Sequence, residues 1–182
     1  AVEAGMARDL HLSSTQFGLA AAVFFTTYCA MQVPIVALLT HVGPRRVLAT
    51  AITLWGAVGA LTAAARGPVS LSLARALLGV FEAGFYPGSV YVISSFYPPG
   101  ETSTPTAILT TMGGVGYTIG SLSSGFIMQG LNGALGLAGW RWLLIVQGAP
   151  AVLVGLLIAC LLPDSPQTAS FLSPAERESI DA

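Results

Sequence analysis

Charged side chains are scarce in this sequence of 182 residues. The chain has no Lys, and its seven Arg with its eight Asp or Glu amount to 8% of the residues, while 54% are hydrophobic. A soluble domain carries about 25% charged residues, so the composition excludes an ordinary soluble fold. The same apolar character excludes a disordered chain. A polytopic membrane protein remains, with the lipid bilayer as its surroundings.

The sequence also lacks the features of nucleic-acid-binding proteins, metal sites and enzymes. The net charge of −1 gives no basic field, so we expect no nucleic-acid partner. The two cysteines lie in apolar runs and form neither a disulfide framework nor a metal cluster. The sequence contains no serine–histidine–acid set, no HExxH and no GxGxxG. We therefore expect no enzyme, no metal and no cofactor.

Long runs without any charge are the main positive feature. A helix needs about 20 mostly apolar residues to cross a bilayer, and lipid offers no partner to an open backbone polar group. The runs predict an all-α protein with five transmembrane helices. Their predicted ranges are roughly 16–39, 47–65, 70–96, 104–129 and 142–162.

Local signals mark the ends of these spans. Ser13 followed by Gln16 predicts a capping box before the first span. The sequence Pro98-Pro99-Gly100 predicts the end of the third span. Ser173 with Glu176 three residues later predicts the start of one more helix, which is polar.

Glycine and proline predict features inside the spans. Pro87-Gly88 predicts a kink or a loosened turn in the third span. Gly84 with Gly88, and Gly116 with Gly120, are GxxxG pairs. Such pairs favour close helix packing in membranes.

Two charges, Arg75 and Glu82, lie inside the third span. A charge in the hydrocarbon costs at least about 2.5–3.5 kcal/mol, so such residues are functional candidates. Seven residues separate them, which places both on one helix face. Gly79 lies between them and is expected to leave this face open, and Tyr86 continues it. One interpretation is a cavity with an anion-binding Arg and a protonatable Glu; the alternative is a structural ion pair.

The first span contains a polar pair, Tyr28 and Gln32, four residues apart. Such spacing places both side chains on the same face of a helix. Gln32 could line a polar cavity, or it could hydrogen-bond to a neighbouring helix. With Tyr86, these two residues are candidates for substrate binding.

Several strings of this sequence resemble the major facilitator superfamily, in particular the anion:cation symporter branch with its fungal allantoate, nicotinate and pantothenate permease-like group. They are spread in the family's order over nearly the whole chain. The strings are FFTTYCAMQVP (24–34), HVGPRR (41–46), ARALLGVFEAGFYPG (74–88), GWRWLLIVQG (139–148) and LPDSPQTASFLSPAERE (162–178).

The resemblance implies an architecture. The five spans would be the second to sixth helices, in the N-terminal half of a twelve-helix carrier, and the remaining helices would be partners beyond this fragment. Residues 1–15 would be extracellular, 16–162 the membrane part, and 163–182 the start of the central cytoplasmic loop. Gly43, Arg45 and Arg46 match the family's gating motif in the loop after the second helix, without its acidic member.

The resemblance also implies a function. Related organic-anion carriers hold an Arg and a Glu seven residues apart in the fourth helix, with roles in anion binding and proton sensing, and Arg75 and Glu82 match that pair. The implied protein is a secondary active transporter of the plasma membrane that takes up a small organic anion, carboxylate or vitamin-like, together with a proton. The alternative is a transport-inactive receptor or regulatory fragment on the same fold.

Overall fold

The chain forms helices throughout the part that the structure, a computed structural model, describes, which is residues 2–98 and 100–181. Three residues lie outside the described part: Ala1 and Ala182 at the ends of the sequence, and Pro99 in the predicted break after the third span. The all-α class is confirmed. The helices are α1 (Val2–Asp9), α2 (Ser14–Val42), α3 (Pro44–Leu61), α4 (Pro68–Glu82), α5 (Phe85–Phe96), α6 (Ser103–Gly130), α7 (Gly139–Leu161) and α8 (Pro174–Asp181). The 3₁₀ turns are η1 (Thr62–Ala64), η2 (Ala134–Gly136) and η3 (Pro166–Thr168).

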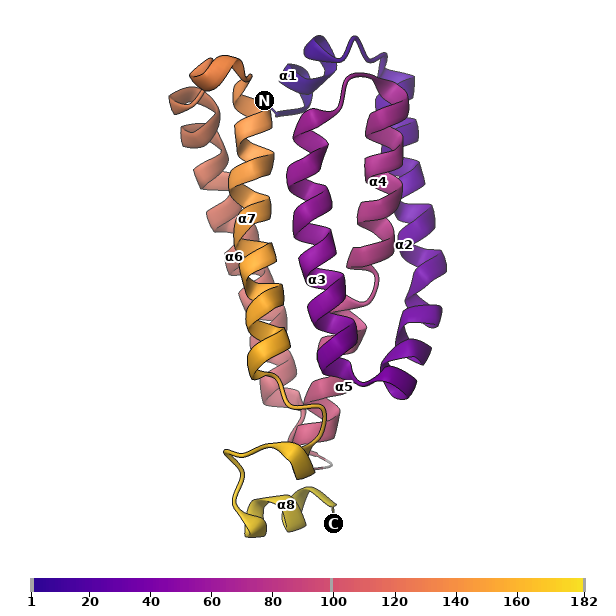
Figure 1. The fold of residues 1–182 in the computed structure, drawn as a ribbon, viewed down its shortest axis with the longest axis vertical. Coiled ribbons are helices and arrows are strands. Elements are labelled where there is room, and N and C mark those ends of the chain that lie inside the picture. Colours follow the sequence, from indigo (N-terminus) through magenta and orange to yellow (C-terminus); the bar gives the residue numbers. More distant parts are fainter. Residues whose placement is uncertain (1, 99, 182) are drawn as a thin grey trace.

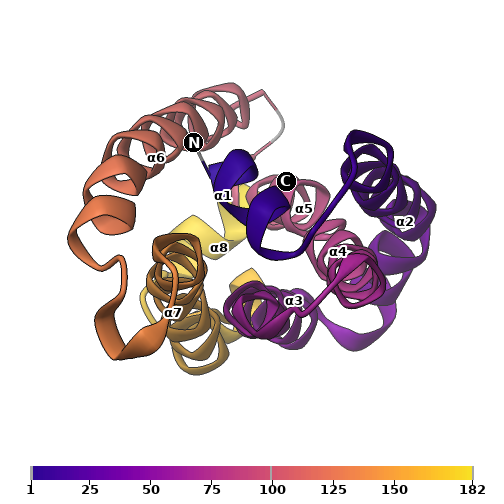
Figure 2. The ribbon, with the colours of Figure 1, turned by 90° about the horizontal axis from the view of Figure 1, so that it is seen from above.

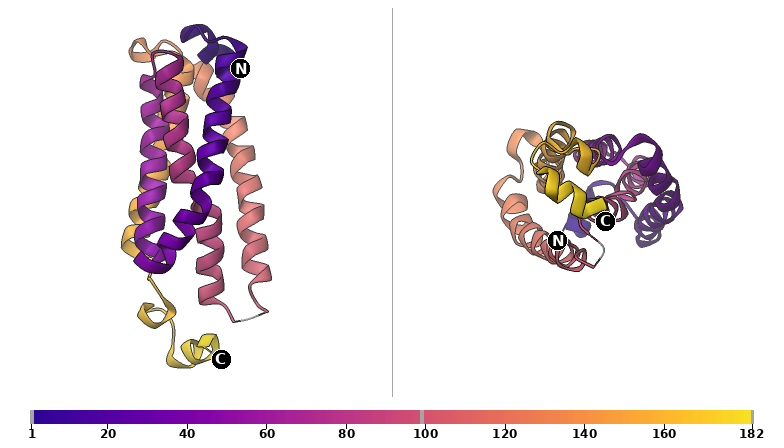
Figure 3. Two further views of the ribbon diagram at one scale, coloured as in Figure 1. Left: turned by 90° about the vertical axis from the view of Figure 1, so that its right-hand side faces the viewer. Right: turned by 90° about the horizontal axis from the view of Figure 1, so that it is seen from below.

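The long helices stand side by side as an upright bundle (Figure 1). The short helix α1 lies across one end, and α8 lies at the other, so we name these the α1 end and the α8 end (Figures 1 and 3). Seen from above, α3 stands between α7 and α4, with α2 beyond α4 and α6 beyond α7 (Figure 2). Helices α2, α4, α5 and α7 therefore descend toward the α8 end, while α3 and α6 rise.

Four helical stretches among the described residues are long and apolar enough to cross a membrane. They are Ser14–Val42, Pro44–Ala64, Pro68–Phe96 and Gly139–Leu161. Helix α6, the fourth predicted span, has 28 residues and carries no charge. It is not among these four stretches, because its many Gly, Ser and Thr residues lower its mean hydropathy. The fold is that of a multi-pass membrane protein, and the exact membrane limits stay a prediction.

The third predicted span is broken and not continuous. Helix α4 ends at Glu82 and α5 begins at Phe85, so the break precedes the kink predicted at Pro87-Gly88. The reason is the geometry of proline, whose ring clashes with the carbonyl group four residues earlier, here that of Ala83. Pro87 thus stands in the first turn of α5, where a proline is tolerated.

Glycines allow close packing between helices, but of the two predicted GxxxG pairs only one takes part. A Cβ on Gly148 of α7 would lie 2.6 Å from the Gly56 carbonyl oxygen of α3, so these two backbones touch. A Cβ on Gly88 would lie 2.7 Å from Leu48, which fits the predicted packing of the Gly84–Gly88 pair.

The other predicted GxxxG pair packs differently. Nothing lies within 4 Å of the Cβ position of Gly116, and that of Gly120 meets only the Gln147 side chain at 3.8 Å. No residue of α6 is buried among those described. The prediction that this face makes close contacts is therefore wrong for the described part of the chain, because α6 stands at the edge of the bundle.

Both predicted capping boxes are present. The backbone N–H of Gln16 donates to the Ser13 hydroxyl (3.2 Å), and the Ser13 N–H donates back to Oε1 of Gln16 (2.9 Å). At α8, the backbone N–H and the hydroxyl of Ser173 both donate to Glu176 at 2.7 Å. These two hydrogen bonds lower the pKa of Glu176. The short polar helix α8 is thereby capped as the sequence predicted.

Two apolar clusters stabilise the two halves of the bundle. Near the α1 end, Trp140 is 2% exposed and its indole N–H donates to Asp9 of α1 at 2.7 Å. The residues of this cluster are Met6, Leu10, Ala20, Ala65, Leu71 and Trp140. Toward the α8 end the cluster comprises Ile35, Leu39, Val47, Leu48, Ile52 and Ala83. The charged pair of α4 lies along the bundle between these clusters.

Candidate functional site

Helix α4 carries both intramembrane charges. Arg75 lies at its middle and Glu82 is its last residue, immediately before the break. Both side chains are half-buried. Arg75 acts on the Glu82 carboxylate by Coulomb attraction, yet no direct ion pair joins the two within the part of the chain that the structure describes. The guanidinium is therefore not locked to this carboxylate.

The face between these charges is closed by α2. Gly79 is buried, and a Cβ there would collide with the Thr27 hydroxyl and the Phe24 carbonyl oxygen. The Thr27 hydroxyl also donates to the Ala76 carbonyl oxygen of α4 at 3.0 Å. The expectation that Gly79 leaves an open face is wrong. This glycine instead lets the backbones of α2 and α4 approach each other.

The same contact brings Tyr28 and Gln32 toward the charges. Gly84 packs against Ile35 of α2, and the two helices descend together at about 1.5 Å per residue. Glu82, two residues before Gly84, therefore stands at the level of residue 33, next to Gln32. Tyr28 lies one turn above and stacks on Phe24 with 5.9 Å between ring centroids. Glu82 and Gln32 thus lie at one level, with Tyr28 one turn above them.

Two further residues belong to this neighbourhood. Tyr86, in the first turn of α5, is 48% exposed and lies one turn below Glu82. Trp55 of α3 was not predicted, and its side chain lies close to Glu82. No local pattern marks Trp55, because it stands in an ordinary apolar run and its neighbour comes from another helix.

The loop motif lies away from these residues, at the α8 end. Gly43 has φ +96°, and a Cβ there would lie 2.6 Å from a carboxylate oxygen of Asp164. The backbone N–H of Arg45 donates to the same carboxylate at 3.2 Å, and Arg45 Nε donates to the Ala159 carbonyl oxygen at 2.6 Å. Arg46 is exposed. Asp164 thus supplies an acidic partner that the loop itself lacks, and it caps α3, whose N-cap Gly43 has no side chain.

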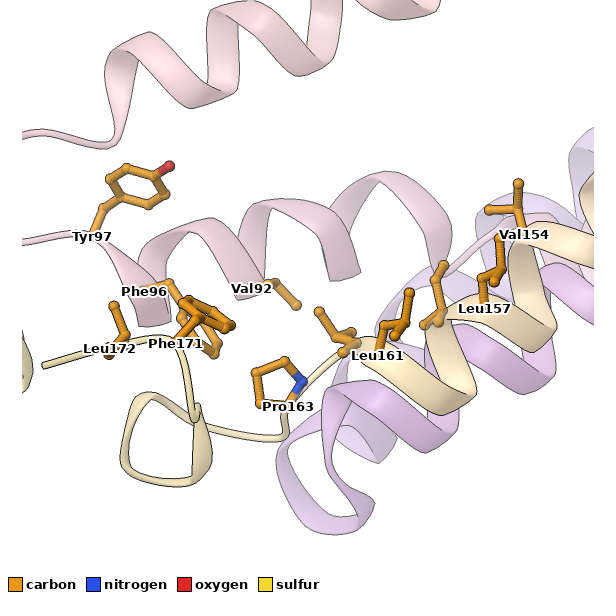
Figure 4. A pocket seen from close by; sticks show the side chains of 11 residues that line it. Val92, Phe96, Tyr97, Val154, Leu157, Leu161, Pro163, Phe171 and Leu172 are labelled. Carbon is orange, nitrogen blue, oxygen red and sulfur yellow. The ribbon is translucent and has the colours of Figure 1, made fainter.

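An apolar cavity of about 590 Å³ also opens at the α8 end, between α5 and the end of α7 (Figure 4). Phe171 from the C-terminal segment lies beside Phe96, with 6.5 Å between ring centroids. None of the described residues that line this cavity is charged, and Arg75 and Glu82 are not part of it.

The pattern of the Major Facilitator Superfamily matches residues 1–181. The chain belongs to the Major Facilitator Superfamily. This is a family of transporters and not of enzymes, as expected from the sequence. The match agrees with the all-helical bundle and its candidate spans.

Relatives of the superfamily are longer than this chain. The "Putative tartrate transporter" of Agrobacterium vitis is 40% identical over 172 residues, which cover 94% of this chain and 40% of that protein. The inner membrane transport protein RhmT of Escherichia coli (strain K12) is 32% identical over 169 residues, which cover 93% and 39%. The chain thus spans about 40% of the length of these curated relatives.

A solved structure has the same fold. It is a bacterial homolog of the human lysosomal transporter Spinster in an inward-facing, unoccupied conformation. The TM-score is 0.73 at 23% identity, over 96% of this chain and 42% of that chain. At this identity the likeness concerns the fold alone, which is the N-terminal part of a superfamily transporter.

Proposed function

We propose that the chain is part of a secondary active transporter of the anion:cation symporter branch that takes up a small organic anion together with a proton. The observation that carries the proposal is Arg75, a cation inside an apolar helix whose guanidinium forms no ion pair within the described residues. A guanidinium binds a carboxylate through two parallel hydrogen bonds. The name of one relative, which refers to tartrate, also favours a carboxylate substrate.

Around Arg75 the proposed site has distinct parts. Glu82 is the proton-coupling residue, because it is the carboxyl group on the same helix face, seven residues away. Tyr28, Gln32 and Tyr86 offer hydroxyl and amide groups that can bind the remaining oxygens of the substrate. Proton uptake by Glu82 would remove a negative charge near Arg75 and strengthen its attraction for an anion. Proton and anion binding would then favour each other in both directions.

The proposed topology follows the predicted ranges. Residues 1–15 would be outside the cell, 16–162 would form the membrane part in the plasma membrane, and 163–182 would begin a central cytoplasmic loop. The loop motif of Gly43, Arg45 and Arg46 would then lie on the cytoplasmic side and serve as a gate. Reporter tags placed at the two ends should report opposite sides of sealed cells, and finding them on the same side would exclude this arrangement.

Arg75→Lys tests the anion site in the complete carrier that contains this chain. The substitution keeps the charge but removes the bidentate fork, so substrate uptake should fall by about tenfold or more, as expected when a charge-assisted hydrogen bond of about 1.5–3 kcal/mol is lost. Arg66→Lys, at an exposed position ahead of α4, is the matched control and should leave uptake unchanged. Normal uptake by a normally abundant Arg75→Lys variant would assign this residue to structure.

Glu82→Gln tests the proton site, because the amide imitates the protonated carboxyl permanently. The variant should still exchange substrate across vesicle membranes but should lose accumulation driven by external acid. Glu101→Gln, in an exposed loop, is the matched control. Full pH dependence and uphill accumulation in Glu82→Gln would place the proton site elsewhere.

A further inference from the structure

Trp55 is a large side chain that neither apolar cluster includes. It is 38% exposed, whereas Ile52, almost one turn earlier on the same helix, is 5% exposed. Tryptophan combines an apolar ring with a single N–H donor and has no acceptor. For a half-exposed tryptophan inside a helix bundle, the question is therefore which acceptor its N–H can bind.

The register of the helices places Trp55 at the level of Glu82. Gly88 of α5 packs against Leu48 of α3, and α3 runs opposite to α4 and α5 (Figure 1). Counting from this contact, Glu82 lies six residues above Gly88, about 9 Å, and Trp55 lies seven residues above Leu48, about 10 Å. The Trp55 side chain also lies close to Glu82. The register of the helices and this proximity thus identify the same neighbour.

Trp55 is held on a helix that packs tightly against its neighbour at this point. The next residue, Gly56, is buried, and a Cβ on it would lie 2.7 Å from the Val152 nitrogen and 2.8 Å from the Gly148 carbonyl oxygen of α7. The backbone of α3 therefore has no room to shift at this point. Glu82, in contrast, is the last residue of α4 before the break. A fixed donor thus faces a carboxyl group at a joint.

We propose that Trp55 is a positioning residue, whose indole N–H holds the ionised carboxylate of Glu82 against α3 and releases it when Glu82 is protonated. An ionised carboxylate binds an N–H donor more strongly than a neutral carboxyl does. Protonation would thus weaken the link between α3 and the joint of α4 and α5. The inference rests on the proposed function of Glu82.

Other polar groups around Glu82 do not provide this link. Arg75 on the same helix attracts the carboxylate from a distance, Tyr28 and Gln32 approach from α2, and Tyr86 lies below on α5. Of these, Arg75 is the basic side chain, and it has no hydrogen bond to α3 among the described residues. Trp55 is therefore the donor that ties the carboxylate to the neighbouring helix.

Trp55→Phe in the complete carrier tests the proposal, because it keeps a ring and removes the N–H. Without the donor the charged carboxylate is less favoured, so the pH of half-maximal uptake should rise by about one unit, the equivalent of a lost hydrogen bond to a charged group. The matched control is Trp142→Phe, which removes an indole N–H that donates to the Ala134 carbonyl oxygen at 2.9 Å. It should leave the pH profile in place.

A double variant separates this role from simple packing. In the Glu82→Gln background Trp55→Phe should cause no further change in uptake, because the ionised carboxylate is gone. An equal loss in both backgrounds, or an unmoved pH profile in Trp55→Phe, would overturn the proposal. If Glu82→Gln itself keeps full pH dependence, the proposed function fails first, and that outcome is distinct from a failure of Trp55 alone.

A second variant covers the case in which Trp55→Phe does not reach the membrane. Trp55→Tyr keeps a ring with a hydroxyl that both donates and accepts. It can bind either protonation state of Glu82, so the profile should move in the same direction by less than half as much. An unmoved profile in this variant, at normal abundance, would equally overturn the proposal.

Discussion

Helices α3 and α6 are both long and contain glycine, but they occupy very different surroundings. Along α3, Gly56 lies against the backbone of α7, and buried residues extend along much of the helix. Along α6, Gly113 and Gly116 have nothing within 4 Å of their Cβ positions, and no described residue is buried. The same residue type therefore closes a helix contact in one place and leaves a face free in another.

The largest expected effect comes from filling the closed contact. In Gly148→Val the new side chain would meet the Gly56 carbonyl oxygen at 2.6 Å and the Ala60 nitrogen at 2.9 Å. Backbone atoms of a packed helix cannot move aside cheaply, so the free energy of unfolding should fall by about 3 kcal/mol. Thermal unfolding in detergent and abundance in the membrane would both measure the loss.

Gly116→Val is the matched control for this prediction. It adds the same side chain to a helix of the same bundle, but into open space. Its unfolding should stay within about 0.5 kcal/mol of the wild type, as for other substitutions outside tight contacts. Equal losses in the two variants would mean that the distinction between α3 and α6 is wrong.

A smaller effect is expected from the polar link at the α8 end of the closed contact. Asp164 caps α3 through the Arg45 N–H, and losing a capping side chain costs about 1 kcal/mol. Asp164→Ala should lower the free energy of unfolding by that amount, measured as above. Glu101→Ala removes an exposed carboxylate at the same end and should change little. Unchanged unfolding in Asp164→Ala would show that water caps α3 equally well.

Local patterns predicted the helices well, because their causes lie within a few residues. Charge-free runs located the long helices, and the capping boxes at Ser13 and Ser173 formed as the spacing indicated. The placement of Arg75 and Glu82 on one helix, seven residues apart, followed in the same way from helix geometry. Each of these features depends on the chain's own neighbours.

Contacts between distant segments escaped prediction. Trp55 faces Glu82 and Asp164 caps α3 only because separate helices meet there. Gly79 was expected to leave a face open, but α2 fills it. A single sequence gives the period of a helix, whereas the identity of the helix that covers each face depends on how the whole chain packs.

The smallest expected effect concerns the open side of the bundle. Gly113→Ala adds one methyl group where nothing lies within 4 Å, and alanine is preferred over glycine inside a helix by about 0.5–1 kcal/mol. The variant should therefore unfold at a slightly higher temperature than the wild-type chain.

Comparing the same substitution in the complete carrier sharpens the result. If the gain persists there, this face of α6 meets lipid or a loosely packed neighbour. If the gain turns into a loss, another segment of the carrier packs against Gly113 as closely as α7 packs against Gly56. A loss in the 182-residue chain itself would contradict the open surroundings of α6, because no described atom is close enough to clash with the new methyl group.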